Sequence, residues 1–178
     1  MNARRSILLT VFVAGVCAVL SGALWQLGSG PTQATSETIT RSTSPSAVTR
    51  HADRTQQTQA LTILRAWDAR RAQAWAAGDV AGLRRLYTSG SVSGASDCAD
   101  LQRYVDRGLV VEGMTTQILA ASVVTFEPEH VVLDVTDRLA ASTAVGDGGR
   151  FKLPGTQAQA LTVELVRQHG VWLVRENR

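Results

Sequence analysis

Asp137 is the residue whose type and spacing most directly suggest chemistry. It belongs to the apolar run HVVLDVTDRLAAS, which follows the run MTTQILAASVVTF across a polar turn. A tight turn at Pro128-Glu129 makes these runs a β-hairpin and sets Ala120 opposite Asp137, with Ser122 on the same face. The small side chains of Ala120 and Ser122 leave space beside the acid. The pattern predicts a pocket with a carboxylate on its wall, a group that can act as a general acid or base.

Two other interpretations of Asp137 stay open. The residue could end its strand near a bulge, or Arg138 or another arginine could neutralise it. A catalytic carboxylate also needs a second titratable group with an opposed pKa, and the sequence singles out none. Structural roles for Asp137 therefore stand beside the catalytic one.

The remaining residues that commonly bind metals or cofactors are scattered. His51 lies in a polar segment, whereas His130 and His169 lie at predicted turns, so no cluster of metal ligands is expected. Cys98 is the only cysteine outside the predicted membrane span, which excludes an internal disulfide. The segment GDGGR joins two predicted strands and is expected to be a loop. The sequence holds no P-loop, dinucleotide fingerprint or nucleophile elbow, so we expect no metal and no cofactor.

A helix is expected to cover the hairpin. In ALTILRAWDARRAQAWAAGD the apolar residues recur with helical spacing and include Trp67 and Trp75. Both tryptophans are expected to belong to the core face, and Trp67 is also a candidate for the pocket wall. Asp68 lies beside the apolar stripe, within reach of Arg65 or Arg71.

Two further helices and four strands complete the predicted domain. Gly78 should end the first helix, Asp79 should cap a second one in DVAGLRRLY, and a third should run from near Ser96 to Gly108. Beyond Gly108 the apolar period changes to two, which indicates strands in MTTQILAASVVTF, HVVLDVTDRLAAS, TQAQALTVELVRQ and VWLVREN. Three helices followed by a four-stranded antiparallel meander form an α+β layout.

This order of elements resembles the nuclear-transport-factor-2-like superfamily, an α+β cone found in many small bacterial proteins. The resemblance covers Ala60 to Asn177 and rests on ILRAWDARRAQAWAAGDVAGLRRLYT followed by the long hairpins. In that family an opening helix ends in an AGD-type turn, and a short helix then leads to a Tyr or Phe. Residues 77–79 and Tyr87 match this pattern. The resemblance implies that residues 58–178 form three helices packed on a curved four-stranded antiparallel sheet.

The resemblance implies little about activity, because the same cone serves enzymes and non-enzymes. In the isomerases and dehydratases of the family, an acid and a tyrosine line the pocket. This makes Tyr87 and Tyr104 catalytic candidates beside Asp137, while the pocket candidates are Trp67, Ala120, Ser122 and Asp137.

The first 57 residues predict an export segment and a tether. Segment 6–27 carries no charge, and as a helix of about 33 Å it could cross a hydrocarbon core of about 30 Å. Arg4 and Arg5 place residues 1–5 in the cytoplasm, which predicts a single-pass plasma-membrane protein with its C-terminal domain outside the cytoplasm. A signal peptide cleaved after Ala23 is the alternative. Segment 28–57 is rich in Ser and Thr and is expected to be a disordered linker.

The distribution of charge argues against nucleic-acid binding. The net charge of +3 comes from the first 57 residues, which hold five arginines and two acids. From Thr58 onward thirteen basic and thirteen acidic residues balance, so no basic stripe for nucleic acid is predicted.

Three classes of function are compatible with these features. An anchor, a linker and a cone resemble mammalian-cell-entry-associated membrane proteins, which implies a non-enzymatic scaffold in the cell envelope with a protein partner or a second copy of the chain. The alternatives are a module that binds a small apolar ligand and an isomerase- or dehydratase-like enzyme that uses the pocket acid. A filled cone with an arginine on Asp137 favours the scaffold, and an open apolar cavity favours ligand binding. Convergence of Asp137 and a tyrosine in an open cavity favours the enzyme.

Overall fold

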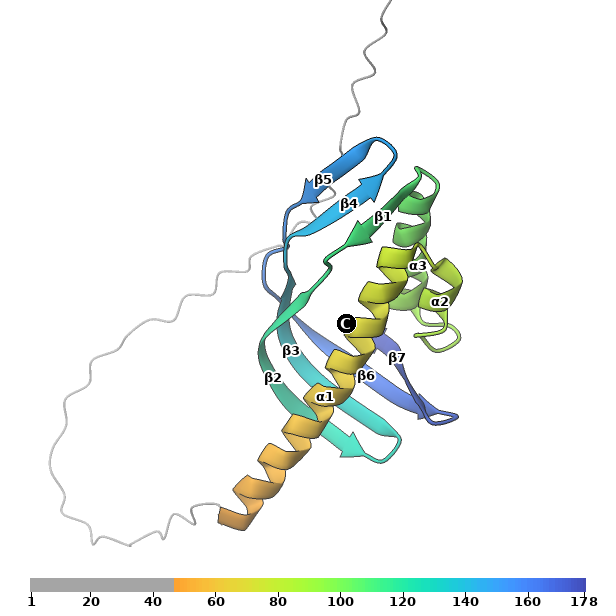
Figure 1. Cartoon of the computed structure of the whole chain (residues 1–178). Helices are drawn as coiled ribbons and strands as arrows, with labels where there is room; N and C mark the ends of the chain where they lie inside the picture. The colour runs from red at the N-terminus through yellow and green to blue at the C-terminus, as the bar shows by residue number, and fades with distance from the viewer. Residues whose placement is uncertain (1–46) are drawn as a thin grey trace, which may run out of the picture. The chain divides into compact units, whose positions relative to one another are not determined.

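The structure is a computed structural model of the chain, and it describes residues 47–178 (Figure 1). The predicted cytoplasmic segment 1–5, the anchor 6–27 and residues 28–46 of the predicted linker lie outside the described residues. None of the helices within 47–178 is long and apolar enough to cross a membrane. Three helices are followed by seven strands in this part of the chain, so the predicted α+β class is confirmed.

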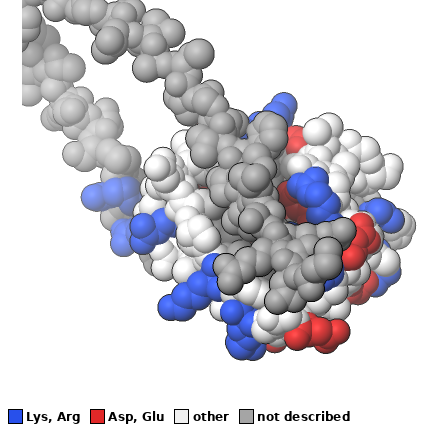
Figure 2. All heavy atoms as spheres, turned by 90° about the horizontal axis from the view of Figure 1, so that it is seen from above, with Lys and Arg blue, Asp and Glu red and all other residues white. Residues whose placement is uncertain are grey.

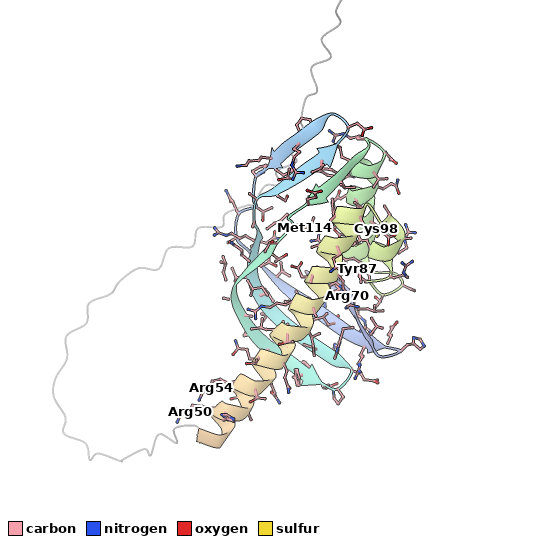
Figure 3. The ribbon with its side chains drawn as sticks, viewed as in Figure 1. Arg50, Arg54, Arg70, Tyr87, Cys98 and Met114 are labelled. Carbon is pink, nitrogen blue, oxygen red and sulfur yellow. The ribbon has the colours of Figure 1, made fainter. Side chains whose placement is uncertain are left out.

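Helix α1 extends from Ala47 to Ala77 and begins inside the predicted linker. Residues 47–57 are therefore helical, a correction to the disorder expected for 28–57. Residues 50–56 are exposed to solvent, so this part of the helix needs no apolar period. Figure 3 shows Arg50 and Arg54 on this exposed part of the helix. Gln57 bonds this part of the helix to strand β2 (Thr116–Glu127), because its Nε2 donates to the backbone oxygen of Ala121 at 2.8 Å.

Helix α2 extends from Val80 to Arg84 and follows α1 through a tight turn. Gly78 ends α1 with φ of 65°, in the left-handed region that favours glycine. Asp79 then caps α2, because its carboxylate accepts a hydrogen bond from the N–H of Gly82 at 2.7 Å. Both predicted boundaries are confirmed.

Helix α3 extends from Val92 to Val105, and so begins before the predicted start near Ser96. Its cap is Ser91, whose Oγ accepts a hydrogen bond from the N–H of Gly94 at 3.0 Å. Several serines in the segment TSGSVSGAS could cap a helix, and the sequence does not distinguish them.

The strands form two antiparallel sheets, which corrects the predicted single sheet of four strands. The larger sheet has the order β2-β3-β6-β7 and contains the four predicted strands: β2 Thr116–Glu127, β3 His130–Leu139, β6 Gln159–Gln168 and β7 Val171–Asn177. The smaller sheet has the order β1-β4-β5: β1 Leu109–Glu112, β4 Ser142–Gly146 and β5 Gly149–Leu153. Its strands are short, and the glycines around Asp147-Gly148, predicted to be a loop, make the tight turn between β4 and β5.

Two β-bulges in β2 correct the predicted register of the β2–β3 hairpin. The end next to the turn pairs as predicted, but Leu119 and Val124 are extra residues without a partner on β3. Asp137 therefore pairs with Ile118 and not with Ala120. Each bulge adds one residue to a strand and bends it, and strict alternation along the sequence does not reveal it.

The core lies between the helices and one face of the larger sheet. The buried side chains of that face include Val131, Leu133 and Leu165. Trp67 and Trp75 on α1 are only 4% and 5% exposed, so the predicted core face of this helix is confirmed. Figure 1 shows α1 crossing the curved strands of the larger sheet, with α2 and α3 beside it.

Candidate functional site

A cavity of about 520 Å³ opens between α1, α3 and the inner face of the larger sheet. Part of its wall is apolar and consists of Leu64, Trp67, Ile118, Leu139, Leu161 and Val163. The rest is polar and includes several aspartates. The inner face is therefore not filled by its own side chains, and it offers an apolar surface beside four aspartates and two arginines.

The predicted site residues divide between three places. Asp137, Trp67 and Tyr87 line this cavity. The other pocket candidates, Ala120 and Ser122, line a separate depression with Asp134, on the side of the sheet that alternation directs away from the core. Tyr104 lines neither place and packs edge to face on Trp75, with ring centroids 5.7 Å apart.

Asp97 on α3 organises one end of the cavity. Its carboxylate accepts hydrogen bonds from Arg71 Nε at 2.7 Å and Nη2 at 2.5 Å, from Tyr87 Oη at 2.8 Å and from Trp75 Nε1 at 3.2 Å. The two bonds to Arg71 form a bidentate ion pair, the strongest common arrangement for these groups. Arg71 also donates to Met114 Sδ at 3.3 Å, and Figure 3 shows Met114 and Tyr87 near α1. This network joins α1 to α3 and holds the ring of Tyr87.

Asp68 and Asp137 are held differently from Asp97. Asp68 Oδ1 accepts a hydrogen bond from Thr116 Oγ1 at 2.8 Å. The structure gives Asp137 no side-chain hydrogen bond and no ion pair among the described residues. The adjacent Arg138 instead donates to Gln117 on the exposed side. Among the described residues no arginine forms an ion pair with Asp137.

The pKa values of Asp137, Tyr87 and Arg71 are all shifted, each by a different combination of burial and nearby charge. Burial raises the pKa of the Asp137 carboxyl above its ordinary value, repulsion by Asp68 raises it further, and attraction to Arg71 acts in the opposite direction. Burial also raises the pKa of the Tyr87 hydroxyl, and the charge of Asp97 adds to this effect. Burial alone would lower the pKa of Arg71, but hydrogen bonding and attraction to Asp97 outweigh it. Arg71 and Tyr87 therefore keep their protons at neutral pH.

Three residues of the site carry roles that the sequence did not assign. The spacing on α1 suggests a pairing of Asp68 with Arg71, whereas Asp68 contacts Thr116 and Arg71 contacts Asp97. Asp97 lies on α3, and its partners Tyr87, Trp75 and Arg71 are 10, 22 and 26 residues away in sequence. No local pattern connects residues at such separations, so only the packing of α3 on α1 reveals the network.

Charge on the described surface is mixed. On the face shown in Figure 2, basic and acidic side chains are both present. No group of three or more His, Cys, Asp or Glu side chains within the described part of the chain could hold a metal ion.

Comparisons with known proteins give similarity of fold only. Neither a protein-family model nor a curated protein sequence matches the chain. Among solved structures, a protein of unknown function from Mycobacterium tuberculosis aligns with a TM-score of 0.47 and 14% identity, over 70% of this chain and 72% of that one. The intermembrane space region of the chloroplast protein ARC6 aligns with a TM-score of 0.45 and 12% identity, over 68% and 93% of the two chains. A protein from Rhodospirillum rubrum aligns with a TM-score of 0.39 and 19% identity, over 62% and 91%; it is described as NTF2-like and of unknown function in nutrient uptake. Similarity at this level carries no statement about function.

Proposed function

We propose that residues 47–178 form a module that binds a small organic molecule in the cavity between α1 and the larger sheet. The observation that carries the proposal is the open space of about 520 Å³ with an apolar wall and convergent polar groups. Ligand pockets in proteins commonly have volumes of about 300–1,000 Å³ and this kind of lining. A filled cone with an arginine on Asp137 would favour a scaffold, and the described residues show neither feature.

We further propose that segment 6–27 anchors this module in the plasma membrane and that it acts outside the cytoplasm. The support is the uncharged stretch behind Arg4 and Arg5. A scaffolding role beside the binding role, as the mammalian-cell-entry resemblance implies, stays a prediction.

Acid–base catalysis is the second candidate, and the raised pKa of Asp137 favours it. The arrangement of Tyr87 argues for binding instead. Its hydroxyl donates to Asp97 at 2.8 Å, so its proton is directed at that carboxylate and not at a substrate beside Asp137. The pair of acid and tyrosine that the family resemblance implies is thus divided between two networks.

The proposal is tested by filling the cavity. The full-length chain in detergent is screened against a panel of small cationic, neutral and anionic aromatic compounds by ligand-observed NMR. Leu161→Trp places bulk in the cavity wall, whereas Ala160→Trp places it on the exposed neighbouring residue of the same strand. We expect compounds to bind the parent chain and the Ala160→Trp variant, and to lose binding in Leu161→Trp. A panel without any binder, or equal binding to all three proteins, would refute the proposal.

A further inference from the structure

We infer that the occupant of this cavity is an organic cation, a primary amine or a related protonated nitrogen group on a small apolar body. This inference rests on the proposed binding function and adds the chemical class of the ligand. It is based on two observations of the cavity wall. Several hydrogen-bond donors there are already bonded within the protein, and two carboxylates form no ion pair among the described residues.

Two of the four aspartates on the wall, Asp68 and Asp137, form no ion pair among the described residues. Arg71 is committed to Asp97 through two hydrogen bonds, and Asp100 pairs with Arg103 on the exposed side of α3. Asp68 contributes more than Arg71 to the electrostatic environment of Asp137. Two carboxylates thus face one space without a direct ion pair in the described part of the chain, and the guanidinium of Arg71, which attracts both, is bonded to Asp97.

Arg65 is the other guanidinium on this wall, and its residue is exposed to solvent. It forms no ion pair with Asp68 or Asp137 among the described residues. Ion pairs between such solvated side chains contribute little to stability, because water screens the charges. A ligand that carries its own positive charge into the cavity can therefore compete with Arg65 for these carboxylates.

Three donors of the wall, those of Trp67, Tyr87 and Thr116, are already used inside the protein. Trp67 Nε1 donates to the backbone oxygen of Leu86 at 2.8 Å. The hydroxyl of Tyr87 donates to Asp97, and the hydroxyl of Thr116 donates to Asp68. When the N–H and O–H groups of a side chain already form hydrogen bonds within the protein, the side chain can offer a ligand mainly hydrogen-bond acceptors.

Acceptors remain in the same wall. Asp68 uses one carboxylate oxygen for Thr116, and neither oxygen of Asp137 receives a hydrogen bond among the described residues. The side-chain oxygen of Asn177 is buried beside this cavity and also has no hydrogen-bond partner there. A buried acceptor without a donor is costly, and an ammonium group supplies three donors and no acceptor.

The apolar wall determines the rest of the ligand. Leu64, Ile118 and Leu161 face the space beside the carboxylates. A bare metal ion would leave this surface in contact with water, and it would find two carboxylates where Ca²⁺ takes about 6–8 oxygen ligands. An aliphatic or aromatic amine fills the volume and places its charged end against Asp68 and Asp137.

The experiment compares three probes of nearly equal size by titration calorimetry on the full-length chain in detergent at pH 7. The probes are 2-phenylethylammonium, neutral 2-phenylethanol and anionic 3-phenylpropanoate. Each titration has a detergent blank. Because a hydrogen bond to a charged group contributes about 1.5–3 kcal/mol, we expect the ammonium probe to bind about tenfold or more tightly than the alcohol, and the anion to bind most weakly.

Charge-removing variants identify the groups that select the cation. Asp137→Asn and Asp68→Asn should each weaken the ammonium probe about tenfold and leave the affinity for the alcohol unchanged. Unchanged binding of the alcohol also shows that the variant has kept its fold. Asp134→Asn is the matched control, because Asp134 lies on β3 outside this cavity and accepts a hydrogen bond from Thr162. It should leave both affinities unchanged.

The outcomes separate this inference from the proposed function. Equal binding of the amine and the alcohol, or tighter binding of the anion, refutes the inference and leaves the binding function standing. The same holds if other compounds of the panel bind and the amine does not. If calcium chloride displaces the amine from Asp68 and Asp137, these residues form a metal site, and the inference of an organic cation is refuted. A chain that binds no compound refutes both proposals.

Discussion

Two aspartates of one cavity illustrate how partners rather than residue type decide the role of a carboxylate. Asp97 accepts four hydrogen bonds and is neutralised by Arg71. Asp137 receives none among the described residues, although both line the same space. The first carboxylate is part of the scaffold that joins α1 to α3. The second is available to whatever enters the cavity.

This difference predicts that Asp137→Asn leaves the protein as stable as before or more stable. At neutral pH the substitution removes a charge that is partly desolvated and repelled by Asp68. We expect a gain of up to about 0.5–2 kcal/mol, the range of favourable surface-charge changes, measured by denaturant unfolding at pH 7. A clear loss of stability would show that an unseen partner neutralises Asp137.

The pH dependence of the same comparison follows from the direction of the shift. The pKa of Asp137 is raised in the folded state, so the folded chain binds the proton more tightly than the unfolded chain does. The parent protein should therefore recover stability relative to Asp137→Asn as the pH falls through the folded pKa, and the difference should vanish below the ordinary value of about 4. Asp134→Asn should show no such recovery.

The inward orientation of Asp137 could be read from the sequence because β3 alternates without interruption. Asp137 follows Val131, Leu133 and Val135 at intervals of two, and these three side chains are buried. The neighbours on β2 could not be read in the same way, because the bulges shift Ala120 and Ser122 relative to that pattern. Alternation is reliable only within a strand that has no extra residue.

At the level of elements, hydrogen bonds join the last strand, β7, to the start of α3. Glu176 on β7 accepts hydrogen bonds from the backbone N–H groups of Val92 at 3.0 Å and Ser93 at 2.9 Å. These are orphan donors at the start of a helix, where a carboxylate also interacts favourably with the helix dipole. Hydrogen bonds from Ser93 accordingly lower the pKa of Glu176.

Glu176→Gln should therefore destabilise the domain at neutral pH, measured as a lower midpoint of thermal unfolding. The pKa of Glu176 is depressed in the folded state, so its contribution exists above the ordinary value near 4.3 and is lost as the pH falls through the folded pKa. The difference between parent and variant should shrink over that window. Glu129→Gln, an exposed substitution in the β2–β3 turn, serves as the control. Equal melting of Glu176→Gln and the parent at pH 7 would contradict the role of this contact.

Long elements with regular patterns were predictable, and short or solvent-exposed ones were not. The spacing of Trp67 and Trp75 predicts the core face of α1, whereas the polar residues 47–57 of the same helix give no apolar period. β1, β4 and β5 have only four or five residues each, too few to establish a period. Of the two features that shape the cavity wall, the apolar faces follow from local pattern and the Asp97 network follows only from tertiary packing.

For the whole molecule, the N-terminal sequence carries a prediction about where the cavity operates. The uncharged segment 6–27 behind Arg4 and Arg5 predicts that residues beyond 28 lie outside the cytoplasm. Alkaline phosphatase, which is active only after export, should be active when fused after Ser46, and the full-length chain should be retained in the membrane fraction. Activity of a cytoplasm-only reporter at the same position would reverse the orientation. A soluble mature chain that starts at Leu24 would replace the anchor with a cleaved signal.

The bulges of β2 give the hairpin two edges of unequal length. From Thr116 to Phe126 the strand uses eleven residues, whereas the paired stretch of β3 from Val131 to Leu139 uses nine. Two strips bonded along their length must bend when one is longer, so this surplus helps to set the arc of the sheet above α1.

Deleting Leu119 and Val124, both largely exposed, would equalise the edges and keep every remaining pair in register. We expect such a chain to fold with a flatter sheet and a smaller hollow, which a crystal structure would measure. The volume of the cavity would then depend on the number of residues in β2, independently of the side chains that line it.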